Sequence, residues 1–142
     1  MDQSAAEAAR ELRVVFGRLR RRLREVAGVS VLTPSQASVL SRLDKDGPAT
    51  ASGLATAEGV RPQSVAATLA ALEERGLIRR DADPADGRRQ VVSLSDDGRA
   101  RLAGDRQARQ EWLAQAMQDR YSSAERQTIL DALVLLDRLT HP

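Results

Sequence analysis

The stretch ATAEGVRPQSV, residues 55–65, decides the fold. Its small Ala55, its Gly59 and its Val65 follow one another at spacings of four and six residues. A small residue lets two helices approach closely, a glycine adopts the left-handed turn between them, and a β-branched residue packs the second helix onto the first. The stretch therefore predicts a helix-turn-helix, with Pro62 as the first residue of the second helix.

The second helix, from residue 62 to about residue 75, is expected to have two unlike faces. Val65, Leu69 and Leu72 recur at helical spacing and predict the inward face. The outer face and the start of the helix carry polar or basic side chains: Arg61, Gln63, Ser64, Thr68 and Arg75. Arginine and glutamine read purine edges, and hydroxyls reach phosphates. We therefore expect this face to lie in a DNA major groove; an ordinary solvated face is the alternative.

A shorter helix precedes the turn. Thr50 is its predicted cap, and the helix is expected to end near Glu58. We include Thr50 and Ser52, at the start of this helix, among the candidate DNA-binding residues.

A β-hairpin is expected after the second helix. The segments Leu77–Asp81 and Gln90–Leu94 are short strand candidates, and the turn-rich ADPADG, residues 82–87, separates them. Such a hairpin beside a helix-turn-helix is a wing. The segment therefore extends the prediction to a winged helix-turn-helix.

The hairpin carries four arginines: Arg79, Arg80, Arg88 and Arg89. An arginine at a wing tip can enter a narrow minor groove, where the negative potential is strongest. Asp86, two residues before Arg88, is expected to hold the Arg88 guanidinium in a bidentate pair. The alternative is a surface salt bridge that only stabilises the turn.

Two further helices are expected before the helix-turn-helix. Apolar residues at three- and four-residue steps predict the first of them, which should stop at Gly28: Leu12, Val15, Phe16, Leu19, Leu23 and Val26. The motif TPSQ, residues 33–36, then combines a cap, a first-turn proline and a returning glutamine. It predicts the start of the second helix, in which Leu40 and Leu43 should face inward.

Two helices are also expected after the hairpin. Ser95 or Asp96 caps a long helix that reaches about Arg120, although Gly98 and Gly104 should weaken its first turns. Ser122 and Glu125 form a second capping box, which opens a last helix rich in leucine. A terminal helix with so wide an apolar surface usually buries it against another subunit. The predicted fold class is mainly α with a small β-hairpin.

The composition excludes several classes of function. The 142 residues contain no cysteine, which excludes disulfides, thiolate nucleophiles and cysteine-based metal or redox sites. The one histidine, His141, lies beside the C-terminal Pro142 and is expected to be a frayed end, neither a base nor a ligand. We therefore predict no catalytic residue, no cofactor and no metal site.

Hydrophobic residues make up 42% of the chain and charged residues 30%, a balance typical of one globular domain. The net charge is +2, so the placement of the charges matters more than their sum. No apolar stretch approaches the roughly 18 residues of a membrane span, and residues 1–10 do not read as a signal peptide. We expect a cytoplasmic protein without a membrane partner.

The stretch from about Leu32 to Leu102 resembles the MarR (multiple antibiotic resistance regulator) family. Five motifs carry the resemblance by their order and spacing: TPSQ at 33–36, VRPQS at 60–64, LEERGLIRR at 72–80, DPADGRR at 83–89 and VSLSDDG at 92–98. The resemblance implies a transcription regulator that binds double-stranded DNA. It also implies that the family's wing aspartate and arginine correspond to Asp86 and Arg88.

The resemblance further implies a symmetric homodimer, a winged helix-turn-helix inside a helical dimer. Residues 1–30 would form an N-terminal dimerisation helix, residues 31–100 the DNA-binding lobe and residues 101–142 the C-terminal dimerisation helices, all in one integrated domain. The two lobes would place their recognition helices in successive major grooves of a pseudo-palindromic operator.

Many members of this family are repressors that a small aromatic or anionic molecule releases from DNA. Phe16 and Trp112 are the candidate ligand-binding residues, although at helical spacing both also fit an ordinary core. Two other functions stay open. One is a constitutive DNA-binding regulator without a ligand, and the other is a winged-helix module that binds a protein.

Overall fold

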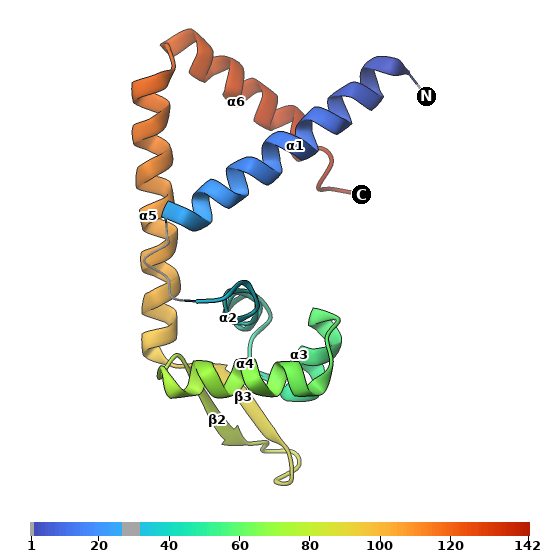
Figure 1. Ribbon diagram of the computed structural model, residues 1–142, viewed down its shortest axis with the longest axis vertical. Helices are drawn as coiled ribbons and strands as arrows, with labels where there is room; N and C mark the ends of the chain where they lie inside the picture. The colour runs from blue at the N-terminus through green and yellow to red at the C-terminus, as the bar shows by residue number, and fades with distance from the viewer. Residues whose placement is uncertain (1, 27–31) are drawn as a thin grey trace. The chain divides into compact units, whose positions relative to one another are not determined.

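A computed structural model describes residues 2–26 and 32–142 of the chain (Figure 1). The chain divides into two compact units. We call residues 27–106 the winged-helix unit, and residues 1–26 with residues 107–142 the terminal-helix unit. The stop predicted at Gly28 lies outside the described residues.

The winged-helix unit contains the predicted helix-turn-helix and hairpin. Its elements are α2 (Pro34–Asp46), β1 (Ala49–Thr50), α3 (Ala51–Glu58), α4 (Pro62–Glu74), β2 (Ile78–Ala82), β3 (Gln90–Leu94) and the first turns of α5 (Asp96–Arg120). The strands form an antiparallel sheet in the order β1-β3-β2. The sequence predicted only the β2–β3 hairpin. The third strand, in which Ala49 pairs with Val92, has two residues and so carries no readable alternation.

Twelve hydrophobic residues are buried in the described part of the chain, and all of them lie in the winged-helix unit: Val39, Leu40, Leu43, Leu54, Ala55, Val65, Leu69, Leu72, Leu77, Ile78, Val92 and Leu94. The inward faces predicted for α2 and α4 are confirmed by this set. Because strand and helix residues share one core, the sheet and the helix-turn-helix hold each other in place.

The turn of the helix-turn-helix has the predicted geometry. Gly59 adopts a φ of +67°, in the left-handed region, and its N–H donates to the carbonyls of Ala55 and Thr56 at the end of α3. Ala55 is 4% exposed, as expected of a small residue at a helix contact. Thr50 caps α3 by accepting the Gly53 N–H at 3.1 Å. The local signals in residues 50–65 are therefore confirmed.

Gly98 has a role that the sequence did not indicate. A Cβ atom at this position would lie 2.1 Å from the carbonyl oxygen of Leu77, far inside contact distance. Ser95 reinforces the contact, because its Oγ donates to the Gly76 carbonyl at 2.5 Å and accepts the Gly98 N–H at 3.0 Å. Gly98 was expected to weaken the first turn of α5. In the structure its missing side chain lets α5 begin against the turn between α4 and β2.

The terminal-helix unit consists of α1 (Gln3–Val26), the remainder of α5, and α6 (Ser123–Asp137). The predicted capping box opens α6, since Ser122 Oγ accepts the Glu125 N–H at 3.2 Å and Glu125 accepts the Ser122 N–H at 2.7 Å. No described residue of this unit is buried. Apolar side chains of α1 and α6 are exposed instead: Val14, Val15, Phe16, Leu19, Leu130, Leu133, Val134, Leu135 and Leu136.

Within residues 2–26 and 32–142, no helix combines the length and the apolar character that crossing a membrane requires.

Candidate nucleic-acid interface

The outer face of α4 is polar and exposed. Arg61 is the N-cap residue of α4 and its side chain makes no capping hydrogen bond, and Gln63 and Ser64 in the first turn are exposed. Thr68 Oγ1 donates to the Ser64 carbonyl at 3.0 Å. Arg75 is exposed at the C-cap. The side chains predicted to read DNA therefore do lie on one accessible helix, and its N-terminal dipole favours anions.

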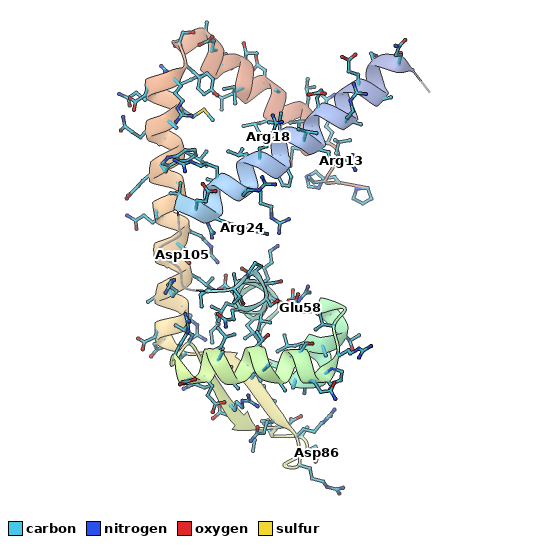
Figure 2. The ribbon with its side chains drawn as sticks, viewed as in Figure 1. Arg13, Arg18, Arg24, Glu58, Asp86 and Asp105 are labelled. Carbon is cyan, nitrogen blue, oxygen red and sulfur yellow. The ribbon has the colours of Figure 1, made fainter. Side chains whose placement is uncertain are left out.

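The hairpin tip is ordered by carboxylates that accept backbone N–H groups. Asp83 accepts from the Ala85 N–H at 2.9 Å, and Asp86 accepts from the Arg88 N–H at 3.1 Å. The backbone closes the tip with a 2.9 Å bond from the Asp83 N–H to the Arg89 carbonyl. Asp86 lies at the tip of the hairpin (Figure 2). The two bonds that the carboxylates accept form Asx-type turns, which the aspartates in residues 82–87 favour.

The predicted pairing of Asp86 with the Arg88 guanidinium is wrong. Asp86 Oδ2 lies 3.9 Å from Nε of Arg89, and Asp83 Oδ2 lies 3.8 Å from the same nitrogen. Asp86 contacts Arg88 only through the backbone N–H. The i,i+3 spacing brings Arg89 near Asp86, and the backbone bond that closes the tip brings it near Asp83. Among the described residues, the Arg88 guanidinium has no carboxylate partner, so its charge is available to an anion.

The two arginines of β2 lie on opposite faces of the sheet. Ile78 is buried, and strand alternation therefore directs Arg80 inward and Arg79 outward. Arg79 is exposed, whereas the Arg80 side chain is 26% exposed and its Nε lies 2.6 Å from Glu73 Oε2. We had expected both arginines to face DNA. The alternation around Ile78 was the signal in the sequence that separates them.

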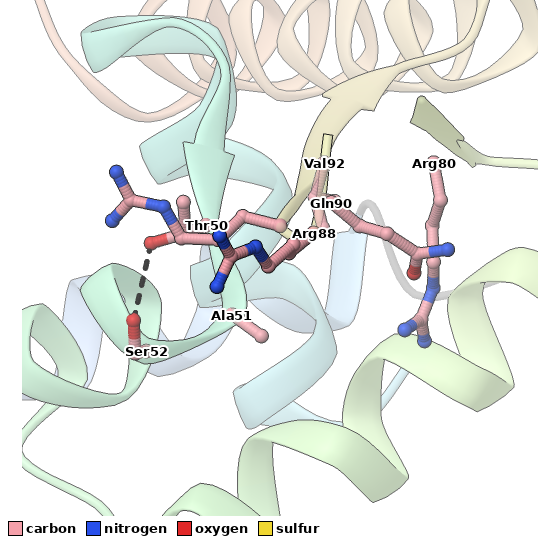
Figure 3. A pocket seen from close by; sticks show the side chains of 8 residues that line it. Thr50, Ala51, Ser52, Arg80, Arg88, Gln90 and Val92 are labelled. Carbon is pink, nitrogen blue, oxygen red and sulfur yellow. Dashed lines mark hydrogen bonds between the residues drawn. The ribbon is translucent and has the colours of Figure 1, made fainter. Parts of the chain in front are cut away.

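A pocket of about 340 Å³ lies between the start of α3 and the wing (Figure 3). Its lining residues are Thr50, Ala51, Ser52, Arg80, Arg88, Arg89, Gln90 and Val92. Thr50 Oγ1 and Ser52 Oγ are 3.3 Å apart at its edge. The pocket thus brings the candidate hydroxyls of α3 together with the wing arginines. Gln90 was not among the predicted residues; its place two positions before the inward Val92 was the available signal.

The two candidate ligand-binding residues are in the terminal-helix unit. Phe16 is 60% exposed on α1. Trp112 is half-buried, and its ring centroid lies 5.4 Å from the Arg22 guanidinium and 6.0 Å from that of Arg120. Both distances are in the range of cation–π contacts. The described residues contain no group of three or more acids or histidines placed to hold a metal ion.

Comparisons with known proteins agree with this geometry. A family model described as MarR family matches residues 32–90. An HTH-type transcriptional regulator of Mycobacterium tuberculosis (strain CDC 1551 / Oshkosh) is 38% identical over 117 residues, which cover 82% of each chain.

Solved structures extend the similarity over the whole chain. A transcriptional regulator protein of Pseudomonas aeruginosa PA01 is 40% identical with a TM-score of 0.87, and the match covers 100% of this chain and 99% of that one. A mutant of S. aureus MepR, solved bound to an oligodeoxyribonucleotide, shares the fold at 22% identity and a TM-score of 0.73, covering 93% and 97% of the two chains. The chain therefore belongs to the MarR family of transcriptional regulators.

Proposed function

We propose that this chain is a sequence-specific repressor that binds a pseudo-palindromic operator as a homodimer. The observation that carries the proposal is the combination, within one unit, of an exposed polar α4 face with an Arg88 guanidinium that has no carboxylate partner among the described residues. The bound oligodeoxyribonucleotide of the MepR mutant supports it, because that protein shares this fold.

Each part of the interface has a distinct task in this proposal. Arg61 and Gln63, at the start of α4, read base edges in the major groove, where their donors and acceptors match purines. Ser64 and Thr68 contact phosphates or thymine methyl groups along the same face. Arg88 enters the flanking minor groove. Thr50 and Ser52, at the start of α3, hold the phosphate backbone and so fix the register.

A second copy of the chain is the proposed partner of α1 and α6. Leu133, on α6, is 54% exposed in the single chain, and its apolar neighbours are similarly uncovered. Contiguous apolar surface of this kind marks an interface. The dimer would use residues 1–30 and 101–142, leave residues 31–100 to bind DNA, and present its half-sites about 34–36 Å apart. In this proposal the protein acts in the cytoplasm, where it binds the genome.

We further propose that a small aromatic or anionic molecule releases the operator. Trp112 with the guanidinium groups of Arg22 and Arg120 near its ring supports this step, since an aromatic ring beside two cations offers both stacking and charge to such a ligand. A regulator that binds DNA constitutively is the alternative. Titration of aromatic carboxylates against the DNA complex separates the two, because only a ligand-released repressor loses DNA affinity as the carboxylate is added.

The decisive experiment is selection of DNA by the purified full-length protein. Sheared DNA from the source genome is bound at two salt concentrations, and the retained fragments are sequenced. We expect a pseudo-palindrome to be enriched, with an affinity that falls steeply as salt rises, because phosphate contacts release counterions. If no sequence is enriched at either salt concentration, the repressor proposal is refuted and the face of α4 becomes a candidate surface for a protein partner.

A further inference from the structure

We propose that Glu73 and Arg80 form an ion pair that positions the wing against the recognition helix, so that Arg80 is a positioning residue and not a phosphate contact. The inference rests on the proposed DNA-binding function. It concerns how the α4 face and Arg88 come to act on one DNA duplex together.

The pair joins the two elements that carry the interface. Glu73 lies in the last turn of α4, and Arg80 lies at the middle of β2, opposite Val92 of β3. Arg80 Nε and Glu73 Oε2 are 2.6 Å apart. In Figure 3 the Arg80 side chain runs from its strand toward the light green helix. The pair therefore links the last turn of α4 to the middle of β2, across the turn at residues 75–77 that connects them.

The pair is partly buried. Arg80 Nε is inaccessible to solvent and has no aligned hydrogen-bond acceptor among the described residues, although the Arg80 side chain as a whole is 26% exposed and that of Glu73 is 51% exposed. Removing the Glu73 carboxylate takes away the anion beside this shielded nitrogen, whereas removing both partners leaves no unpaired group. Without Glu73, we expect Arg80 to turn toward solvent and β2 to move with it, which displaces Arg88 at the wing tip.

Glu74 provides a matched comparison. It is the next residue of α4, carries the same charge and is exposed, with no ion-pair partner in the described part of the chain. Removing either carboxylate lowers the repulsion between this helix and DNA phosphates, so simple electrostatics predicts tighter binding for both changes. A positioning role for Glu73 predicts the opposite sign for Glu73→Gln alone.

The first test measures affinity for the selected operator. We expect Glu73→Gln to weaken binding about 5- to 20-fold and Glu74→Gln to leave it unchanged or up to about 3-fold tighter. In an Arg88→Ala background, the effect of Glu73→Gln should shrink to less than about 2-fold, because the wing contact that it supports is already lost. Equal effects of Glu73→Gln in both backgrounds would overturn the positioning role.

A charge exchange separates positioning from direct contact with phosphate. Arg80→Glu alone should weaken binding at least as much as Glu73→Gln. The double variant Glu73→Arg/Arg80→Glu should recover most of the affinity, because the pair is restored with its ends reversed. If the double variant stays as weak as Arg80→Glu, Arg80 itself contacts DNA and the proposal is wrong.

A measurement without DNA keeps the two proposals apart. Amide hydrogen exchange in β2 (residues 78–82) should be faster in Glu73→Gln than in the wild type, and unchanged in Glu74→Gln. Equal exchange in all three proteins would overturn the pair as a positioning device, even if the wild type binds its operator. Wild-type protein that binds no duplex would refute the repressor proposal, and the exchange result would then decide the pair by itself.

Discussion

The winged-helix unit and the terminal-helix unit differ in how far their hydrophobic side chains are buried within a single chain. All twelve buried hydrophobic residues among the described ones lie in the first unit, where helices and strands share one core. The second unit has well-formed helices and a complete capping box, but none of its described residues is buried. Both units therefore have clear helix-capping motifs, whereas, among the described residues, buried hydrophobic side chains lie only in the winged-helix unit. The difference indicates that the first unit is stabilised within the chain, and it supports the proposal that the second is stabilised by association.

The largest expected effect comes from placing charge on the apolar side of α6. Leu133→Glu together with Leu136→Glu should abolish the dimer, at a cost of at least about 4 kcal/mol, since two anchors of an apolar interface become charged. Sedimentation velocity should then report a monomer or an unfolded chain. Circular dichroism should show whether the winged-helix unit keeps its cooperative unfolding.

A control places the same change of charge on the polar side of this helix. Gln127→Glu with Arg138→Gln also lowers the net charge by two, at positions that share a helix side with Asp131. Gln127→Glu replaces the hydrogen bond from Gln127 to Asp131 by a like-charge pair, which should cost only about 0.5 kcal/mol. We expect this variant to sediment as a dimer. A dimer that survives the leucine substitutions, or one that is lost in the control as well, would contradict the assignment of this surface to self-association.

The next effect belongs to the winged-helix unit. Gly98→Ala should lower the free energy of unfolding by about 3 kcal/mol, because the new Cβ would lie 2.1 Å from the Leu77 carbonyl oxygen and the backbone must shift. Gly104→Ala in the same helix meets nothing within 4 Å and should raise stability by about 0.5–1 kcal/mol through helix propensity. Urea unfolding of both variants measures the contrast. Two stabilised variants would mean that α5 does not begin against this turn.

The two glycines illustrate which contacts can be predicted from the sequence and which cannot. Helix caps, the Gly59 turn and the inward faces were predictable because each depends on residues a few positions apart. The contact of Gly98 joins positions 77 and 98, and no local pattern encodes it. The same holds for β1, which pairs with a strand some forty residues later. Long-range contacts of this kind follow only from the assembled core.

The candidate site was predictable to a different degree. The residue types at the wing and on α4 predicted a DNA interface as a set, because arginine and short hydroxyls are the chemistry of phosphate and base contact. In the structure most of these side chains are exposed in one unit, whereas Arg80 lies beside Glu73. Their individual pairings were not identified. The geometry of the turn places Asp86 near the guanidinium of Arg89. Strand alternation directs Arg80 inward, where it pairs with Glu73. Distance along the chain does not predict either pair.

A smaller effect compares how much Arg88 and Arg89 contribute to operator binding, since their guanidinium groups have different carboxylate neighbours. Arg88→Ala should weaken operator binding by about 2 kcal/mol without a change in thermal stability, because its guanidinium has no carboxylate neighbour among the described residues. Arg89→Ala should cost less than about 1 kcal/mol, since Asp83 and Asp86 already share that charge. Fluorescence anisotropy on a labelled operator gives both values. The reverse order would make Arg89 the residue that contacts the groove.

The smallest effect contrasts the capping boxes of the two units. Thr33 and Ser122 each accept the N–H three residues ahead at 3.2 Å, so Thr33→Ala and Ser122→Ala should each remove about 1 kcal/mol of helix stability. The loss should appear in different measurements. Because α6 lacks a core within one chain, Ser122→Ala should weaken dimerisation about 5-fold, whereas Thr33→Ala should leave the dimer Kd unchanged and lower the unfolding free energy. Sedimentation equilibrium over a dilution series measures the dimer Kd of both variants. An equal Kd would mean that the terminal helices, like the winged-helix unit, are stable within a single chain.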